Sequence, residues 1–337
     1  MNNSVKYTNN PNNKAKSRII FDKNDIDKEK DNLAKEGLYF IINIEDQIDT
    51  NYNMLIIGPQ DSPYAGGYYM FDCQFPDQYP FFPMKVLSKT QGGNIRKHPN
   101  LYKNGKCCFS FLGTWNGPPW TACHNPKTVG ISMRSVLTNN PLVNEPGWEN
   151  VFDEKTKLYE DIVKYFNVKY AVIEVLKNLP ENYSDLRSEI YSLFLKNYNI
   201  YLDQINSIKY HDMKTVKSPV YSFEINIDCK ELISDLNRLK KEINIYLSAN
   251  NNDLNENENE NIVNLEIVND TTDISNENIS KQDTGNIKKN SKKSNISRPE
   301  INCQNLEVGH CEKGKDNRYY IVKQYENGHK RWILKKS

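Results

Sequence analysis

The stretch HPNLYKNGKCCFSFLG, residues 98–113, contains two adjacent cysteines, seven and eight positions after an asparagine. Three interpretations are open: one cysteine is a nucleophile, both are metal ligands, or both are small apolar residues of a buried strand. In an extended segment neighbouring side chains point to opposite faces, so we expect Cys107 and Cys108 to face different environments. The features of the whole chain decide between the three.

The chain has 337 residues, enough for one large or two ordinary domains. Its net charge of +1 gives no general reason to expect nucleic acid or an acidic membrane surface as a partner. The first residues lack the apolar run of a secretory signal, and no stretch has the length and apolarity to span a bilayer. Seven cysteines, an odd number, favour free thiols in a reducing compartment. We therefore expect a cytoplasmic protein, with the nucleus, or the host cytoplasm for a viral chain, as alternatives.

Composition divides the chain into four regions, 1–16, 17–247, 248–299 and 300–337, and we expect the second region to contain two parts. We predict a disordered N-terminus over 1–16, an α+β core over 17–150, a helical extension over 151–247, a disordered linker over 248–299 and a small β tail over 300–337. The linker is rich in Asn, Glu, Lys and Ser and has no aromatic residue, so it cannot bury enough apolar surface to order itself.

The tail is predicted to be a β-hairpin. Asn327-Gly328 stands between two β-rich runs, which is the strongest short-range signal for a tight hairpin turn. Tyr320, Val322 and Trp332 are candidates for a small apolar core. A piece of this size is marginally stable alone.

Periodicity predicts an N-terminal helix, an antiparallel four-stranded meander and a series of C-terminal helices. Asn125 is a candidate N-cap and Pro126 suits the first position of a helix. The predicted strands lie within 37–46, 51–59, 67–76 and 83–90, and the predicted helices cover 17–33, 125–137, 152–178, 183–207 and 230–247.

Three blocks in this order resemble the ubiquitin-conjugating enzyme family. They are GPQDSPYAGGYYMFDCQFPDQYPFFPMKV (58–86), HPNLYKNGKCCFSFL (98–112) and NNPLVNEPG (139–147). Several blocks with matching order and spacing are far more specific than a single short motif. The resemblance covers about residues 17–247 and is strongest to the larger, Z-type members, which carry a C-terminal helical extension.

The resemblance implies transfer of ubiquitin, or of a ubiquitin-like modifier, through a cysteine thioester in an ATP-dependent pathway. It places the nucleophile at Cys108, eight residues after Asn100 of His-Pro-Asn, and assigns Asn100 to stabilisation of the oxyanion. A fixed amide N–H suits that role, although Asn100 is also a good turn-former. Cys107 falls where the family usually has a small aliphatic residue, and free cysteine is a common buried hydrophobe.

Four other residues near the motif are supporting candidates. His98 is expected to be structural, and Ser110 lies two positions after the nucleophile, near the cleft. Many family members carry an acidic residue before Pro-Leu-Val that orients the incoming lysine. This chain has Asn140 there, which leaves Glu145 as a weak candidate for that role.

The resemblance also implies protein partners. These are ubiquitin or a relative, the ubiquitin-activating enzyme, a ubiquitin ligase and substrate proteins, with neither membrane nor nucleic acid expected. Phe81 and Trp120 are the candidates for ligase contact, although the chain reads WTAC where the family usually has Trp-Ser-Pro-Ala.

Three other functions compete with this interpretation. Zinc binding is disfavoured because adjacent ligands on a strand diverge and no Cys-x-x-Cys pair is present, so we expect no metal and no cofactor. A Cys-His protease is disfavoured because Cys123 and His124 are neighbours in sequence, whereas catalytic pairs meet across a fold. The remaining alternative is an inactive family variant that only binds ubiquitin, but such variants lack the cysteine.

Overall fold

A computed structural model describes residues 5–8, 11–44, 49–268, 310–313, 319–324 and 330–334. The chain forms two compact units, residues 1–270 and residues 271–337. The predicted α+β core and the predicted helical extension both lie in the first unit. The predicted β tail lies in the second.

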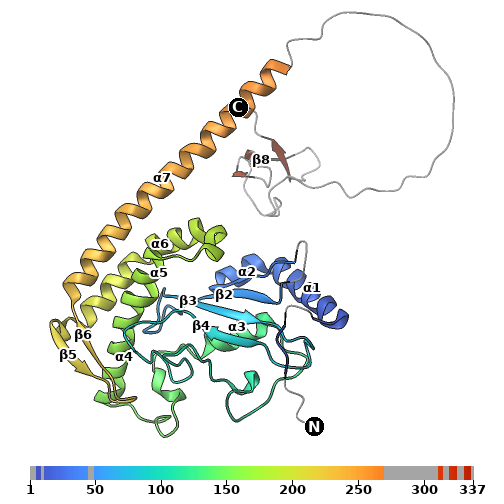
Figure 1. The fold of residues 1–337 in the computed structure, drawn as a ribbon. Helices are drawn as coiled ribbons and strands as arrows, with labels where there is room; N and C mark the ends of the chain where they lie inside the picture. Colours follow the sequence, from blue (N-terminus) through green and yellow to red (C-terminus); the bar gives the residue numbers. More distant parts are fainter. Residues whose placement is uncertain are drawn as a thin grey trace, which may run out of the picture. The chain divides into compact units, whose positions relative to one another are not determined.

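The first unit contains the predicted N-terminal helix, four-stranded antiparallel sheet and C-terminal helices (Figure 1). The helices are α1 (Asn13–Lys28), α2 (Lys30–Lys35), α3 (Pro126–Ser135), α4 (Glu154–Phe166), α5 (Val175–Lys177), α6 (Arg187–Ser207) and α7 (Cys229–Val268). The strands are β1 (Leu38–Ile41), β2 (Asn51–Ile57), β3 (Tyr68–Gln74), β4 (Lys85–Ser88), β5 (Lys214–Lys217) and β6 (Glu224–Ile227). The predicted fold class is confirmed.

The central sheet is a meander in the order β1-β2-β3-β4, with every neighbouring pair antiparallel. Helix α3 covers one face, where a Cβ at Gly130 would lie 2.9 Å from the Phe40 ring. The opposite face is covered by helix α6 of the extension. The Tyr39 hydroxyl donates to the Glu189 carboxylate, and the Tyr68 hydroxyl donates to the Ile190 carbonyl. Burial on both faces explains why β2 and β3 are apolar without strict alternation.

The N-cap prediction for α3 is confirmed. Asn125 accepts a hydrogen bond from the backbone N–H of Thr128, and the Thr128 hydroxyl accepts one from the backbone N–H of Asn125. This reciprocal capping box, with Pro126 at the first turn, fixes where α3 begins.

The helix predicted over 152–178 starts at Glu154 but changes to a π-helix, η3 (Asn167–Glu174), before α5. The Asn167 side chain bonds the hydroxyl of Tyr69, the carbonyl of Ala65 and the side chain of Gln204. These contacts hold Asn167 against the sheet.

After α6 the chain forms a β5–β6 hairpin that the sequence analysis did not predict. Helix α7 then packs on the rest of the extension through bonds such as Tyr198 to Asn237 and Lys177 to Asp235. It ends at Val268, inside the segment 248–299 that was predicted to be a disordered linker. Residues 269–299 lie outside the described residues.

The N-terminal segment also differs from the prediction of disorder over 1–16. Helix α1 begins at Asn13, with Asn12 as its N-cap. Before it, Tyr7 donates a hydrogen bond to the carbonyl of Pro83, and Thr8 bonds the carboxylate of Asp77. Polar residues are therefore held here by contacts with the proline-rich connection, which composition does not reveal.

The second unit contains a three-stranded antiparallel sheet in the order β7-β8-β9. Its strands are β7 (Cys311–Lys313), β8 (Tyr319–Gln324) and β9 (Lys330–Leu334). The predicted pairing of β8 with β9 is present, with Val322 opposite Trp332. Tyr320 and Val322 are buried, as expected for a small apolar core. The predicted turn at Asn327-Gly328 lies outside the described residues.

Candidate active site

The two cysteines of the opening stretch face different environments, as strand alternation predicts. Cys107 belongs to the main apolar core, with its Sγ 3.7 Å from the carbonyl oxygen of Gly105. Burial raises the pKa of the Cys107 thiol to about 12, which keeps it protonated and poorly nucleophilic. Cys108 points the other way, with its Sγ 3.0 Å from the carbonyl oxygen of Thr114.

Asn100 holds Cys108 through both backbone and side chain. The backbone N–H of Cys108 donates to the Asn100 carbonyl at 2.8 Å, and the Asn100 Nδ2 donates to the Cys108 carbonyl at 2.6 Å. The amide oxygen Oδ1 is buried and has no hydrogen-bond partner in the described part of the chain. A primary amide carries a second N–H, which can donate to an oxygen arriving at Cys108.

His98 fixes the backbone of Asn100. Its ring is fully buried, with Nδ1 accepting from the Asn100 N–H at 2.9 Å and Nε2 3.0 Å from the carbonyl of Val136. Burial lowers the pKa of His98 to about 3, despite the hydrogen bond to Val136. A neutral ring with both nitrogens occupied holds the Asn100 backbone, and the structural role expected of His98 stays a prediction.

The segment 113–119 lies over the cysteine. Thr114 donates its hydroxyl to the Cys107 carbonyl at 2.8 Å and accepts from the Phe109 N–H at 2.9 Å. Gly117 has φ +136°, and a Cβ there would lie 3.0 Å from the Cβ of Ser110. The segment therefore folds back onto Ser110, and Cys108 is only 2% exposed.

Lys97 lies directly before His98 and is fully buried. Its Nζ has no hydrogen-bond partner among the residues that the structure describes, and it lies 5.5 Å from the centre of the Phe166 ring. Burial lowers the pKa of Lys97 to about 7, against a small opposing effect of the Cys107 thiol. A lysine with these surroundings costs stability whenever it is charged.

The two candidates for receiving a lysine are both engaged in local contacts. The Oδ1 of Asn140 caps the 3-10 turn η2 (Pro141–Asn144) by accepting from the Leu142 N–H at 3.1 Å. The Glu145 carboxylate accepts a hydrogen bond from the Tyr221 hydroxyl and lies 3.9 Å from the Arg96 guanidinium. Glu145 thus already has two partners within the chain.

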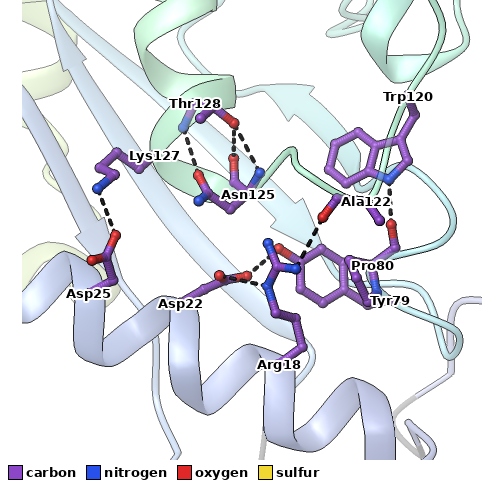
Figure 2. A network of polar contacts seen from close by, with 10 residues as sticks. All are labelled: Arg18, Asp22, Asp25, Tyr79, Pro80, Trp120, Ala122, Asn125, Lys127 and Thr128. Carbon is purple, nitrogen blue, oxygen red and sulfur yellow. Dashed lines mark hydrogen bonds and ion pairs between the residues drawn. The ribbon is translucent and has the colours of Figure 1, made fainter.

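The ligase-contact candidates lie side by side, because the Trp120 indole N–H donates to the Pro80 carbonyl at 2.6 Å (Figure 2). Trp120 also stacks on His124, with ring centres 5.0 Å apart. Phe81, the next residue after Pro80, is 65% exposed. Trp120 anchors this surface, and Phe81 presents a free aromatic ring on it.

Helix α1 holds the loop that departs from the family pattern, as Figure 2 shows. Arg18 donates to the carbonyl of Ala122 at 3.0 Å and pairs with Asp22 at 2.8 Å. Lys127 pairs with Asp25 at 2.6 Å. Side chains of α1 therefore fix the backbone of WTAC, where the family usually has a proline.

No helix in the described ranges combines the length and apolarity of a membrane span. Within those ranges no three His, Cys, Asp or Glu side chains gather in a way that could hold a metal ion.

Comparison with known proteins identifies the domain. Residues 25–169 match the family described as "Ubiquitin-conjugating enzyme". Ubiquitin-conjugating enzyme E2 Z of Xenopus tropicalis is 33% identical over 197 residues, which cover 58% of this chain and 63% of that protein. The human E2 Z is 32% identical over 203 residues (59% and 57%), and that of Danio rerio is 38% identical over 154 residues (45% and 47%).

The helix–meander–helix fold and the His98–Cys108 segment lie in the part of the chain that contains this match, which covers 145 of the 337 residues. The chain is similar to the ubiquitin-conjugating enzyme family over residues 25–169 and, over a longer range, to the E2 Z proteins. It spans between about half and two thirds of the length of these relatives.

Sequence reasoning missed several residues of the site. Thr114 lies in the segment GTWNG, and no local pattern there predicted that it covers the cysteine. Arg96 and Lys97 are two consecutive cations directly before His98, and because such residues are seldom buried, the sequence offered no reason to expect Lys97 in the core. Tyr221 comes from the unpredicted hairpin, more than a hundred residues after Cys108, so no local pattern could find it.

Proposed function

We propose that the chain is a ubiquitin-conjugating enzyme that carries ubiquitin, or a ubiquitin-like modifier, as a thioester on Cys108. The Cys108 thiolate attacks the thioester carbonyl on the activating enzyme, a new C–S bond forms, and the activating enzyme's thiolate leaves. A substrate amine then attacks this carbonyl, a C–N bond forms, and the Cys108 thiolate leaves as the amine loses a proton. Transfer to a ligase cysteine follows the first step in its chemistry.

The observation that carries the proposal is that the two cysteines lie in different environments. Cys107 is a core residue whose thiol is kept protonated by burial. Cys108 is turned away from that core and is held on both sides by Asn100. The amide of Asn100 is therefore fixed beside the nucleophile, where negative charge develops on the carbonyl oxygen.

The lid formed by residues 113–119 adds a step to this mechanism. A thiol that is 2% exposed cannot reach a thioester on another protein, so the lid has to open before loading. Opening breaks the contact of the Cys108 thiol with the Thr114 carbonyl and the hydrogen bonds of the Thr114 hydroxyl to the backbone of Cys107 and Phe109. All seven residues of the lid are exposed, which makes this a local movement.

The partners follow from the same proposal. They are the modifier, an activating enzyme that consumes ATP, a ligase at the surface of Phe81 and Trp120, and substrate proteins. The exposed ring of Phe81 beside an anchored Trp120 supports that surface as the place of ligase contact. The odd cysteine count supports a reducing compartment, so we place the protein in the cytoplasm.

A loading assay tests the proposal and its alternative, a protein that binds ubiquitin without transferring it. The chain is incubated with activating enzyme, ATP and a series of modifiers, and adducts are read on non-reducing gels. We expect a thiol-sensitive adduct with at least one modifier. Cys108→Ser should lose it, whereas Cys107→Val should keep it, because valine fills a similar volume in the core.

Each outcome decides the matter. No adduct with any modifier would support the binding protein. Loss in Cys107→Val together with an adduct in Cys108→Ser would move the nucleophile to Cys107. Loss in both variants would show that the two thiols act together.

A further inference from the structure

The turn between β5 and β6 has an unusual backbone. Tyr221 and Ser222 both have left-handed φ angles, +65° and +50°, and neither is glycine. The turn is closed by a bond from the Ser218 N–H to the Phe223 carbonyl at 2.8 Å. Non-glycine residues adopt this conformation at a cost in free energy, so the contacts of the turn must hold it there.

Those contacts are made with Arg96, which precedes His-Pro-Asn, and with the Glu145 carboxylate beside it. The Tyr221 ring lies over the Arg96 guanidinium, 4.0 Å from its central carbon, and the Tyr102 ring covers the other side at 3.8 Å. The Tyr221 hydroxyl donates to the Glu145 carboxylate, which lies 3.9 Å from the same guanidinium. Arg96 is thus clamped between two aromatic rings beside a carboxylate.

Arg96 in turn holds the backbone of the active site. Its Nη2 donates to the Pro99 carbonyl at 2.5 Å, and its own carbonyl accepts from the Tyr159 hydroxyl at 2.5 Å. The next residue after Pro99 is Asn100, whose carbonyl accepts the Cys108 N–H. A continuous set of close contacts therefore leads from the hairpin to the nucleophile.

We propose that Tyr221 is a positioning residue for catalysis, acting through Arg96 and the Pro99 carbonyl on Asn100. The proposal rests on the proposed function and adds to it a role for the β5–β6 hairpin of the extension, which lies beyond the family match at residues 25–169. With the ring in place, the guanidinium is fixed in plane and its N–H points at Pro99. Without the ring, the guanidinium no longer holds the Pro99 carbonyl in one position, and the amide of the next residue, Asn100, is no longer fixed beside Cys108.

The test compares two substitutions at Tyr221 with a control on the same hairpin. Tyr221→Phe keeps the ring over Arg96, and Tyr221→Leu removes it. Thr215→Ala removes a 2.7 Å bond to Asn226 within the β5–β6 ladder, away from the turn, and is the matched control. Discharge of preformed thioester to free lysine is measured in single turnover, which is independent of the fraction of folded protein.

We expect Tyr221→Leu to slow discharge by about three- to tenfold, the size of one stacked cation–π contact. Loading should change less, because exchange between two sulfurs depends less on the oxyanion. Tyr221→Phe and Thr215→Ala should discharge at the wild-type rate. In an Asn100→Ala background Tyr221→Leu should have no further effect, since both changes act on one group.

Equal discharge by Tyr221→Leu and wild type would overturn the proposal, as would a full additional slowing in the Asn100→Ala background. A wild-type chain that forms no thioester would instead contradict the proposed function. In that case a second measurement tests the clamp, that is, the packing of Arg96 between the Tyr221 and Tyr102 rings. Iodoacetamide alkylation of Cys108, followed by mass spectrometry of its peptide, needs no modifier. A rate altered in Tyr221→Leu but not in Tyr221→Phe or Thr215→Ala supports the clamp, and an unaltered rate excludes it.

Discussion

Replacement of Lys97 by methionine should stabilise the first unit at neutral and acidic pH. Lys97 is fully buried, its Nζ has no hydrogen-bond partner in the described residues, and burial lowers its pKa from 10.5 to about 7. Methionine has a similar length and no charge to desolvate. The substitution therefore removes a cost while keeping the volume filled.

The size of the effect follows from the pKa. In the unfolded chain Lys97 regains its usual pKa of 10.5, so between pH 7 and 10.5 the unfolded state binds the additional proton. Wild-type stability consequently rises with pH through this range, and the cost of the charge is greatest below pH 7. At 1.36 kcal/mol per pH unit the full cost is about 5 kcal/mol, an upper estimate because buried sites relax around a charge.

Urea unfolding followed by tryptophan fluorescence at pH 6, 7, 8 and 9 measures this difference. The gain of Lys97→Met over wild type should be several kcal/mol at pH 6 and should shrink steadily toward pH 9. Lys103→Met, an exposed lysine in the same region, is the control and should leave the pH dependence as it is in wild type. A gain that stays constant from pH 6 to 9, or a loss at pH 6, would refute the reasoning.

Three further predictions follow from the site and the fold. Asn100→Ala should slow discharge to lysine on the order of 100-fold and loading far less, as measured by single-turnover assays; equal discharge would reduce Asn100 to a turn residue. Gly117→Val should lower stability by about 1–3 kcal/mol in urea unfolding, since φ +136° and the close Ser110 Cβ both oppose a side chain, and an unchanged midpoint would show that the lid adapts. Removal of residues 271–337, the second unit, should leave the Tm of the first unit and its loading unchanged; a truncated chain that folds without loading would give the tail a part in catalysis.

Local sequence patterns predicted those parts of the fold whose cause is local. Asn125 and Pro126 start α3 because a cap and a fixed φ act within one turn. The outward face of Cys108 follows from alternation in an extended segment, which depends only on its neighbours.

The missed features depend on partners distant in the sequence. The π-helix at Asn167 exists because its side chain bonds Ala65, Tyr69 and Gln204, which the local helical period cannot show. Similarly, Glu145 looked available for an incoming lysine until the fold brought Tyr221 to it. Buried polar groups are satisfied across the fold, so their roles emerge only with the tertiary structure.

The tyrosine hydroxyls that join the sheet to the extension limit how this chain can be divided. A fragment ending at residue 169, where the family match ends, would strip the cover from one sheet face and leave the Tyr68 hydroxyl without its acceptor at Ile190. Such a fragment loses both apolar contact and a buried hydrogen bond. Because the sheet depends on these contacts with the extension, the two should melt in one transition in the intact chain. The extension is therefore not an interchangeable module. An exchange of the catalytic domain between relatives has to carry the covering helices with it.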